Sequence, residues 1–583
     1  MCVLTRGHRK KLIYRSPLII FRSNTLGKGE PMKNIPIGLS SFMATKDRNY
    51  LYVDKTKEIL SIIKKNRYAS FSRPRRFGKS LTLNTIETLF TYGTEPYFKG
   101  TYIAGNNEDG TPRWTEPTYP VLHLDFSRLD VSSLEVFRKD FLVLINEQCQ
   151  KLGIEKLDCI GLKIGDIISA FTIKLKQTYV LLIDEYDTPL NTLIDNNEMF
   201  EIIRNEIRYF YATIKTSDVS GKIRFLLVTG VTRFSGESIF SAGTNITDIS
   251  YHPQIATLVG YTRDEIELYF KDYIDIAIEK LNHCTISSLS QEQYLSYKKR
   301  LLDKLAAYYD NFCFDEYGET SVFSTWSVNN FFKEANELPE VLFDDYWYDN
   351  GGCPSILVKY LNTHLVHFDV FEQPEIILNA DKFKNPTTLQ SMDQNVLMTQ
   401  CGYLSLKKGY EISEHVALTI PNLELRKALT RLTLYKVFGS FFTNECGDLE
   451  DFIQNATAAQ IVAKFNEILA KIPRSNRYYN FENEHQIKTV LQMFVLGSGI
   501  SCYREVYESQ GFPDFIIELD SKIIIIEFKY TKNSNEVEAK LEDGVNQILA
   551  RDYGASFDCN KDRLKFAVVY DANLRKLVTF KEC

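Results

Sequence analysis

The clearest indication of the fold is a short stretch in the first fifth of the chain: Arg73-Pro74-Arg75-Arg76-Phe77-Gly78-Lys79-Ser80. It follows an apolar run, Tyr68–Ser72, that predicts a strand, and it opens a predicted helix over Lys79–Tyr92. In a loop between a strand and a helix, the backbone N–H groups point toward bound phosphate groups. The stretch therefore predicts a phosphate-binding loop of the P-loop type.

The residue types of this loop indicate bound ATP with its Mg²⁺ ion. Lys79 would reach the β and γ phosphates, and the hydroxyl of Ser80 would hold Mg²⁺. Arg73 stands where the GxxxxGK[ST] pattern has its first Gly, so the loop must turn differently. The arginines of the loop could equally contact a neighbouring subunit or solvent. The predicted nucleotide contacts are Arg73, Pro74, Arg75, Arg76, Phe77, Gly78, Lys79, Ser80 and Leu81.

A second motif supplies the acids that a P-loop site needs. The run Tyr179–Asp184 predicts a buried strand, and it ends in Asp184 and Glu185. Asp184 would complete the Mg²⁺ shell, and Glu185 would orient or deprotonate the attacking water. Acids also cap helices that follow strands, but the order of both motifs along the chain favours a nucleotide site.

A third predicted strand, Ile223–Thr229, ends in polar residues with two interpretations. Thr229 could sense the γ-phosphate, and Arg233 could stabilise charge in the transition state. Either side chain could equally make ordinary surface hydrogen bonds.

Short apolar runs alternate with amphipathic helices throughout residues 35–261. A strand at Val121–Phe126 and a helix at Leu134–Leu152 continue the pattern that the P-loop begins. This alternation predicts an α/β domain with a parallel sheet buried on both faces and right-handed crossovers.

The next region, 262–430, has a mostly helical pattern. Thr262 is the predicted N-cap of its first helix, and Glu265 would complete a capping box.

The last region, 431–583, returns to a mixed pattern. Helices are predicted first, to about Leu496. The later predicted elements are a hairpin of Phe515–Leu519 and Lys522–Tyr530, a helix over Val537–Tyr553 and a strand over Leu564–Tyr570.

Charged residues gather at one edge of that hairpin. Asp514 precedes its first strand, and Glu527 and Lys529 share one face of the second because side chains alternate along a strand. Two carboxylates and an ammonium suit metal-assisted phosphodiester hydrolysis. Asp514 and Glu527 would bind Mg²⁺ or Mn²⁺. Lys529 would position the nucleophile or offset developing negative charge.

Other residues could complete this site. Glu482 or Glu484 on the preceding helix could join the metal shell, and Gln547 and Tyr553 on the following helix could brace it. A surface ion pair is the alternative interpretation. The apolar run Ile523–Ile526 makes the strand central and buried, which favours a metal site.

The composition narrows the class of protein. A chain of 583 residues exceeds what one hydrophobic core supports, so we expect about two to four domains. The net charge of −6 argues against an all-over basic nucleic-acid binder, but it leaves room for one basic groove.

The 11 Cys show no repeated CxxC spacing, which indicates reduced thiols in the cytoplasm and argues against a zinc site. No apolar run approaches the length of a membrane span.

The segment before Met32 is basic and has a short apolar patch, Leu18–Phe21. It could be a targeting or membrane-touching segment. The interpretation that we favour is a disordered or untranslated leader, with Met32 as the start.

Together and in this order, these motifs resemble a predicted AAA-ATPase-like family whose C-terminus is a PD-(D/E)XK nuclease superfamily domain. The similarity covers most of the chain, and in that family the loop also lacks the first Gly. The matching elements are Ile35–Gly38, Tyr52–Thr56, Arg73–Ser80, Ile183–Asp187, Phe240-Ser241 with Asn245, Tyr346-Trp347 and Gln400–Leu404.

The resemblance implies a P-loop ATPase core, a helical middle and a restriction-endonuclease-like α/β C-terminus. Its nuclease motif would map onto Asp514, Glu527 and Lys529, with Glu482 and Glu484 as alternatives for the helix acid. The predicted domains are a basic leader over 1–31, a P-loop domain over 32–261, a helical lid or linker over 262–430 and a nuclease-like domain over 431–583.

The leading interpretation is a cytoplasmic ATP-dependent or ATP-regulated nuclease that acts on DNA or RNA, with Mg²⁺ or Mn²⁺ at the nuclease site. One alternative is a switch that binds ATP and then binds nucleic acid or protein without cutting. Another is an ATPase that remodels a partner protein. The Arg-rich loop is also compatible with sites shared between subunits of a homo-oligomer.

Overall fold

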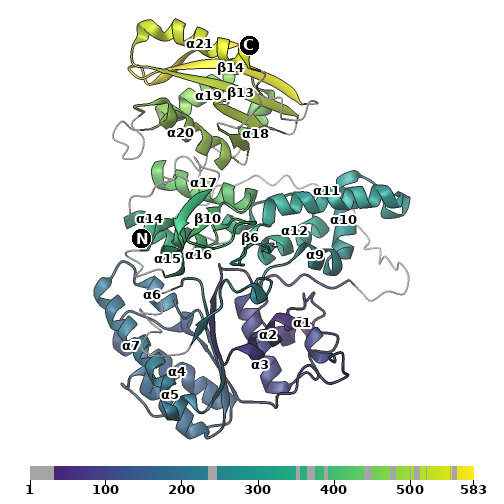
Figure 1. Cartoon of the computed structure of the whole chain (residues 1–583), viewed down its shortest axis with the longest axis vertical. Coiled ribbons are helices and arrows are strands. Elements are labelled where there is room, and N and C mark those ends of the chain that lie inside the picture. Colours follow the sequence, from purple (N-terminus) through teal and green to yellow (C-terminus); the bar gives the residue numbers. More distant parts are fainter. Residues whose placement is uncertain are drawn as a thin grey trace, which may run out of the picture.

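A computed structural model describes most of the chain. The described residues are 32–233, 246–349, 355–363, 375–385, 392–438, 449–472, 481–498, 500–504, 513–519, 521–551, 553 and 561–583. The basic leader, 1–31, and the matching elements Phe240, Ser241 and Asn245 lie outside them. The N-terminal α/β part, the middle region and the C-terminal α/β part follow one another along the long axis of the molecule (Figure 1). The middle region therefore lies between the two predicted sites.

The N-terminal part is built on a five-stranded sheet with the order β2-β3-β4-β1-β5. Every pair of neighbouring strands is parallel. Strand β4 separates β1 from β3, so the carboxyl ends of these three strands lie side by side. The strands are β1 (Tyr68–Ser72), β2 (Val121–Asp125), β3 (Tyr179–Asp184), β4 (Ile223–Gly230) and β5 (Thr247–Asp248).

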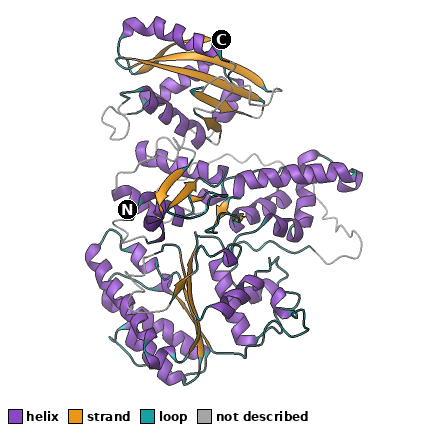
Figure 2. Cartoon of the chain, in the orientation of Figure 1, coloured by secondary structure: helices purple, strands orange, loops and turns teal. Residues whose placement is uncertain are grey.

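Helices cover both faces of this sheet, which explains why every residue of β3 is buried. Helices α2 (Thr56–Lys65) and α3 (Lys79–Tyr92) lie on one side, and α4 (Leu134–Lys151), α5 (Ile164–Leu175) and α7 (Asn197–Lys215) lie on the other (Figures 1 and 2). The parallel sheet predicted from the sequence is therefore confirmed.

Helices dominate the middle region and build a second core. Helix α9 (Arg263–Tyr269) begins after Thr262, and both hydrogen bonds of the predicted capping box with Glu265 are present. With α9 pack α10 (Lys271–Asn282), α11 (Gln291–Tyr309) and α12 (Thr325–Glu337).

The middle region also holds small antiparallel sheets that the sequence analysis did not anticipate. One has the order β8-β10-β9, with bounds Ile376–Asn379, His415–Thr419 and Ser405–Leu406. The other pairs β6 (Phe312–Cys313) with β7 (Ser321–Val322). Strands β6, β7 and β9 have two residues each, which is too few for an alternating pattern to stand out.

Helix α17 (Leu423–Phe438) connects the middle region to the C-terminal part. It runs through the boundary predicted between residues 430 and 431. It packs against α20 (Glu484–Gly497) of the C-terminal part.

The C-terminal part contains a second five-stranded sheet, with the order β11-β12-β13-β14-β15. Strands β13 and β14 are parallel, and the other pairs are antiparallel. Helix α21 (Val537–Ala550) connects β13 to β14 and covers one face, and α19 (Ala458–Ala470) and α20 cover the other. The strand bounds are β11 (Ser501–Tyr503), β12 (Phe515–Glu518), β13 (Lys522–Thr531), β14 (Asp562–Asp571) and β15 (Lys576–Glu582).

The predicted fold class, an α/β P-loop part, a mainly helical middle and a C-terminal α/β part, is confirmed. Across the part of the chain that the structure describes, no helix is both long and apolar enough to cross a bilayer. The shorter helices are α1 (Phe42–Asp47), α6 (Thr188–Thr192), α8 (Ser217–Ser220), α13 (Tyr346–Asp349), α14 (Ser355–Thr363), α15 (Ala380–Lys384), α16 (Gln394–Gln400) and α18 (Leu449–Asn455).

Candidate functional site

The loop after β1 has the backbone of an anion-binding turn. Gly78 precedes α3 with φ of 90°, a conformation that suits glycine, and Arg76 has φ of 68°. The ammonium of Lys79 is buried and donates to the carbonyl oxygens of Arg73 and Pro74, each 3.0 Å away. Burial lowers the pKa of Lys79, while Asp184 and Glu185 act in the opposite direction. The ammonium of Lys79 is therefore held at the N-terminus of α3, where phosphate oxygens can replace the two carbonyl oxygens as its partners.

Asp184, at the end of β3, joins the first turn of α3 to the end of β4. Its Oδ2 accepts a hydrogen bond from the hydroxyl of Ser80, 2.6 Å away, and its Oδ1 accepts one from the hydroxyl of Thr229, also 2.6 Å away. The structure thus unites the predicted residues of the P-loop, of β3 and of β4. A hydroxyl and a carboxylate in contact are hard oxygen ligands, and they fit Mg²⁺.

Glu185 lies at the same edge in a strained conformation. Its φ is 48°, which is rare for a residue other than glycine, and such strain gathers at functional sites. Its carboxylate accepts a hydrogen bond from the hydroxyl of Thr188 at 3.0 Å and lines the pocket beside the loop. Burial raises the pKa of Glu185 above its ordinary value, although Lys79 partly offsets this.

Asp187 is a positioning residue to which sequence reasoning gave no role. Its carboxylate accepts hydrogen bonds from the backbone N–H groups of Val231 and Thr232, the latter at 2.7 Å. A Cβ at Gly230 would lie 2.4 Å from Oδ1 of Asp187, so the close approach requires glycine. Asp187 thereby holds the end of β4, and with it Thr229, beside β3. Asp187 is the third acid of Ile183–Asp187, and this extra acid was the signal available in the sequence.

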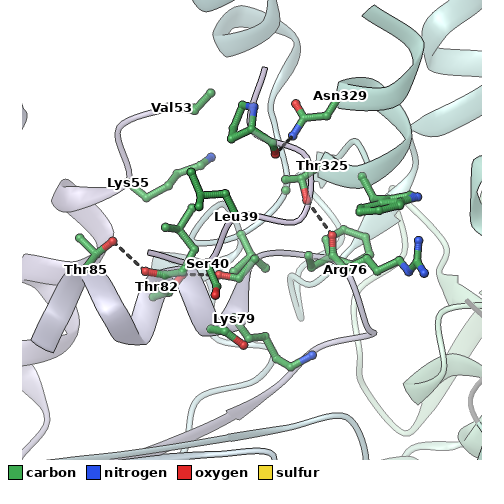
Figure 3. A pocket seen from close by; sticks show the side chains of 18 of the residues that line it. Leu39, Ser40, Val53, Lys55, Arg76, Lys79, Thr82, Thr85, Thr325 and Asn329 are labelled. Carbon is green, nitrogen blue, oxygen red and sulfur yellow. Dashed lines mark hydrogen bonds between the residues drawn. The ribbon is translucent and has the colours of Figure 1, made fainter. Parts of the chain in front are cut away.

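A pocket of about 480 Å³ opens beside the loop (Figure 3). Lys79 lies at one end of it, and Val53 and Asn329 lie toward the other. This volume is within the range of small-molecule sites, about 300–1,000 Å³. Its walls come from segments far apart in the sequence, so sequence reasoning could not assemble it. These segments are 36–40, 51–55, 258–261 and 325–329.

Lys55 is a buried polar residue in this pocket. Its ammonium contacts both carboxylate oxygens of Glu265 at 2.7 Å. Glu265 also accepts from the backbone N–H of Thr262 in the capping box. The start of the middle region is thereby tied to the wall of the pocket.

The arginines of the loop have different surroundings. The side chain of Arg73 is buried away from the pocket. It donates to the carbonyl oxygens of Ser72, at 2.9 Å, and Ser250, and it stacks on Phe314 with 4.2 Å to the ring centroid. The predicted contact of this side chain with the nucleotide is therefore corrected, because it anchors the loop instead.

Arg75 and Arg76 do line the pocket, as do Phe77, Gly78, Ser80 and Leu81. The guanidinium of Arg76 stacks on Trp326 at 4.0 Å, and its carbonyl accepts a hydrogen bond from Thr325. No hydrogen bond or ion pair holds Arg75 among the described residues, which leaves its charge available to a ligand. Pro74 instead faces Gly402, where a Cβ would lie 2.8 Å from its own.

Arg233 is not brought to this pocket. Its guanidinium pairs with Asp248 at 2.7 Å and lies over the ring of Tyr251. It lines a separate cavity of about 390 Å³. The predicted contact of Arg233 with ATP is therefore corrected in favour of a structural ion pair.

The second predicted site forms at the edge of the C-terminal sheet. Phe515 pairs with Ile526, and this register places Asp514 beside the end of β13, where its Oδ2 accepts from the N–H of Phe528 at 3.0 Å. The ammonium of Lys529 donates to Glu527 at 3.0 Å and to Gln547 at 2.7 Å. The structure thus brings Asp514, Glu527, Lys529 and the bracing Gln547 together.

Among the residues at this edge, Glu527 has the surroundings most typical of a functional carboxylate. It is 4% exposed, and among the described residues its Oε2 has no hydrogen-bond partner. Burial, followed by the neighbouring charge of Asp514, raises the pKa of Glu527 to about 7. A buried, unpaired carboxylate oxygen beside a second carboxylate fits a divalent cation.

The helix acids differ in their placement. Glu482 is exposed, whereas Glu484 lies on the first turn of α20 and contacts Lys488 at 3.0 Å. Lys488 also contacts Asp514 at 2.8 Å, so its ammonium stands between the two acids. Within the described ranges, no three His, Cys, Asp or Glu side chains gather closely enough to hold a metal ion. Lys488 thus separates Glu484 from Asp514, which argues against the predicted role of Glu484 as a third ligand and leaves Asp514 and Glu527 as the candidate pair.

Comparisons with known proteins give a family match for each of the two α/β parts. Residues 36–240 match a family model described as a predicted AAA-ATPase, and residues 482–579 match one described as the PD-(D/E)XK nuclease superfamily. The chain is also 26% identical over 510 residues to a protein of Azotobacter chroococcum mcd 1 described as "Uncharacterized protein in vnfD 5'region". That match covers 85% of this chain and 89% of the relative. The chain therefore carries an AAA-ATPase-like domain in its N-terminal part and a PD-(D/E)XK nuclease superfamily domain in its C-terminal part.

Proposed function

We propose that this protein hydrolyses ATP in the pocket beside Lys79, and that nucleotide occupancy controls a metal-dependent nuclease site that cuts DNA or RNA. The observation that carries the ATPase half is the carboxylate of Asp184, which accepts hydrogen bonds from Ser80 and Thr229 at 2.6 Å each. The first turn of α3, the end of β3 and the end of β4 thus each contribute one residue to this cluster.

Each residue of the nucleotide site has a defined task. Lys79 would exchange its two carbonyl partners for phosphate oxygens, and Arg75 would supply a second positive charge at the phosphates. Glu185, with its raised pKa, would accept the proton of the attacking water. Mg²⁺ held by Ser80 and Asp184 would neutralise charge on the phosphates. The pocket between Val53 and Asn329 would take the nucleoside.

The C-terminal site would act on phosphodiesters. Asp514 and Glu527 would hold a divalent cation, which would polarise the phosphate and activate water. Lys529, fixed by Gln547, would place its ammonium against the developing negative charge.

A continuous set of packed groups supports communication between the sites. Phe77 of the P-loop packs against Phe312, Phe314 and Trp347, with ring centroids 4.8, 5.3 and 6.1 Å away. The backbone N–H of Trp347 donates to buried Glu424 at 2.9 Å. The loop that would bind phosphate therefore packs directly against the middle region.

The same contacts continue into the nuclease domain. Glu424 lies in the first turn of α17, and α17 packs against α20. Helix α20 carries Glu484 and Lys488, and Lys488 contacts Asp514. A shift of the P-loop on nucleotide binding would thus reach Asp514 and Glu527, the acidic edge of the C-terminal sheet, through the packed helices α17 and α20. This packing is a physical route for coupling.

The direct test uses the full chain. ATP hydrolysis is measured with Mg²⁺, and cleavage of labelled DNA and RNA is measured with Mg²⁺ or Mn²⁺, with and without ATP. We expect Lys79→Ala to lower hydrolysis about 100-fold or more, and exposed Lys57→Ala serves as the matched control. Lys529→Ala should abolish cleavage and leave ATP hydrolysis intact. Cleavage that survives Lys529→Ala would refute the nuclease assignment.

A second candidate function is a nucleotide-dependent switch or remodelling protein. Its nuclease-like domain would bind nucleic acid or a protein partner without cutting. The observation in its favour is the ammonium of Lys488, which occupies one oxygen of Asp514. ATP hydrolysis together with retained nucleic-acid binding, but no cleavage with either metal, would support this function.

A further inference from the structure

Lys488 is a buried cation that neither proposed reaction uses. It is 5% exposed and lies on α20, one turn after Glu484. Its ammonium contacts Oε1 of Glu484 at 3.0 Å and Oδ1 of Asp514 at 2.8 Å. A buried lysine requires paired carboxylates, because an isolated buried charge is costly. Here the pairing takes one oxygen from a residue of the proposed metal site.

Lys488 and Lys529 each form an ion pair with a different carboxylate of the proposed metal site. Lys529 contacts Oε1 of Glu527 at 3.0 Å, and Lys488 contacts Oδ1 of Asp514. The other oxygen of Asp514 accepts from the N–H of Phe528. Oε2 of Glu527 is the carboxylate oxygen of this pair for which the described residues provide no hydrogen bond.

The charge of the edge follows from this arrangement. Glu484, Asp514 and Glu527 supply three carboxylates, and Lys488 and Lys529 supply two ammonium groups. Removal of Lys488 would increase the negative charge that a divalent cation meets and would free an oxygen of Asp514. At separations of a few ångströms, both changes favour a divalent ion strongly.

We propose that Lys488 is a resident cation that competes with divalent metal for Asp514 and keeps Glu484 out of the metal shell. This inference rests on the proposed metal site at Asp514 and Glu527. It makes Lys488 a positioning residue that sets how readily the nuclease site takes up its ion. Since α20 packs against α17, the position of Lys488 is also where a signal from the nucleotide site would act.

The inference is tested by calorimetric titration of the full chain with Mn²⁺ alone. All variants carry Asp184→Asn, so that the P-loop site does not contribute. We compare this background with Lys488→Met, with Lys488→Arg, and with Lys488→Met combined with Asp514→Asn. Lys464→Met is the matched control, because Lys464 forms a surface ion pair with Glu467 in the same part of the chain. Lys488→Gln replaces Lys488→Met if the latter does not fold.

We expect Lys488→Met to bind Mn²⁺ at least about tenfold more tightly than the background. Lys488→Arg and Lys464→Met should match the background, and Asp514→Asn should remove the gain. If Lys488→Met binds Mn²⁺ and the Asp184→Asn background binds none, the result supports the inference. The same result would count against the natural chain as a metal-dependent nuclease. Equal affinities with and without Lys488, both lost with Asp514→Asn, overturn the inference and leave the metal site standing. Absence of Mn²⁺ binding in every variant overturns both.

Discussion

The ring of Phe77 packs edge-on against the indole of Trp347, with 6.1 Å between the ring centroids and 65° between the ring planes. Phe77 belongs to the P-loop, and Trp347 belongs to the middle region. A packed aromatic contact shifts between discrete arrangements rather than deforming smoothly. Phosphate binding at the loop would therefore be transmitted to Trp347 rather than absorbed locally.

The first prediction concerns this contact. Phe77→Leu should uncouple the two sites, because a smaller, non-planar side chain no longer fills the space among Phe312, Phe314 and Trp347. We expect a loss of about 1–3 kcal/mol in the free energy of unfolding. The change in cleavage rate on adding ATP should shrink at least severalfold. Phe98→Leu, in the core of the P-loop domain, is the control for lost packing alone. An unchanged ATP response in Phe77→Leu would contradict the proposed route.

The second prediction concerns the unusual start of the loop. Arg73→Gly would recreate the usual glycine, yet we expect it to destabilise the protein. The substitution removes hydrogen bonds to the carbonyls of Ser72 and Ser250 and the stacking on Phe314. The expected loss is roughly 2–4 kcal/mol in urea unfolding. A variant as stable as the wild type would show that Arg73 does not anchor the loop.

The third prediction concerns the carboxylate that joins the strand ends. Asp184→Asn should lower ATP hydrolysis about 100-fold or more, because a neutral amide cannot hold Mg²⁺ in the same way. Thr229→Val removes one donor to Asp184 while keeping the shape of the side chain. We expect it to lower hydrolysis about tenfold. Nucleotide binding should survive in Thr229→Val, and it can be followed by the change in tryptophan fluorescence to which Trp326 in the pocket contributes. Full hydrolysis by Asp184→Asn would remove Asp184 from the mechanism.

The fourth prediction concerns pH. Glu424 is buried, and burial followed by the charge of Asp345 raises its pKa well above the ordinary value of 4.5. The folded protein keeps a proton that the unfolded chain releases, so the free energy of unfolding should fall as pH rises above about 4.5. In Glu424→Gln this part of the decline should disappear. Chemical unfolding measured at several pH values checks it, and equal slopes for both proteins would contradict it.

Local patterns in the sequence were sufficient to predict the central strands of the N-terminal sheet. The apolar runs that became β1 and β3 were bounded correctly because the parallel sheet buries both of their faces. Ser80 and Asp184 were brought together as expected, since neighbouring parallel strands end at one edge, and Thr229, for which two interpretations were open, joins them there. The roles of Arg73 and Arg233 were not predictable, because their partners Asp248, Ser250 and Phe314 are contributed by β5, by the segment after it and by the middle region.

Sequence patterns were enough to place the strand–loop–helix of the P-loop, the acids at the end of β3 and the hairpin that carries Glu527 and Lys529. These features depend on short-range periodicity and on residue types at fixed spacing. The folded structure was needed to learn which arginines face the pocket, which segments form its walls, and that Lys488 contacts Asp514. Such contacts join residues far apart along the chain, so they are selected by the packing of whole helices and strands and leave no local pattern in the sequence.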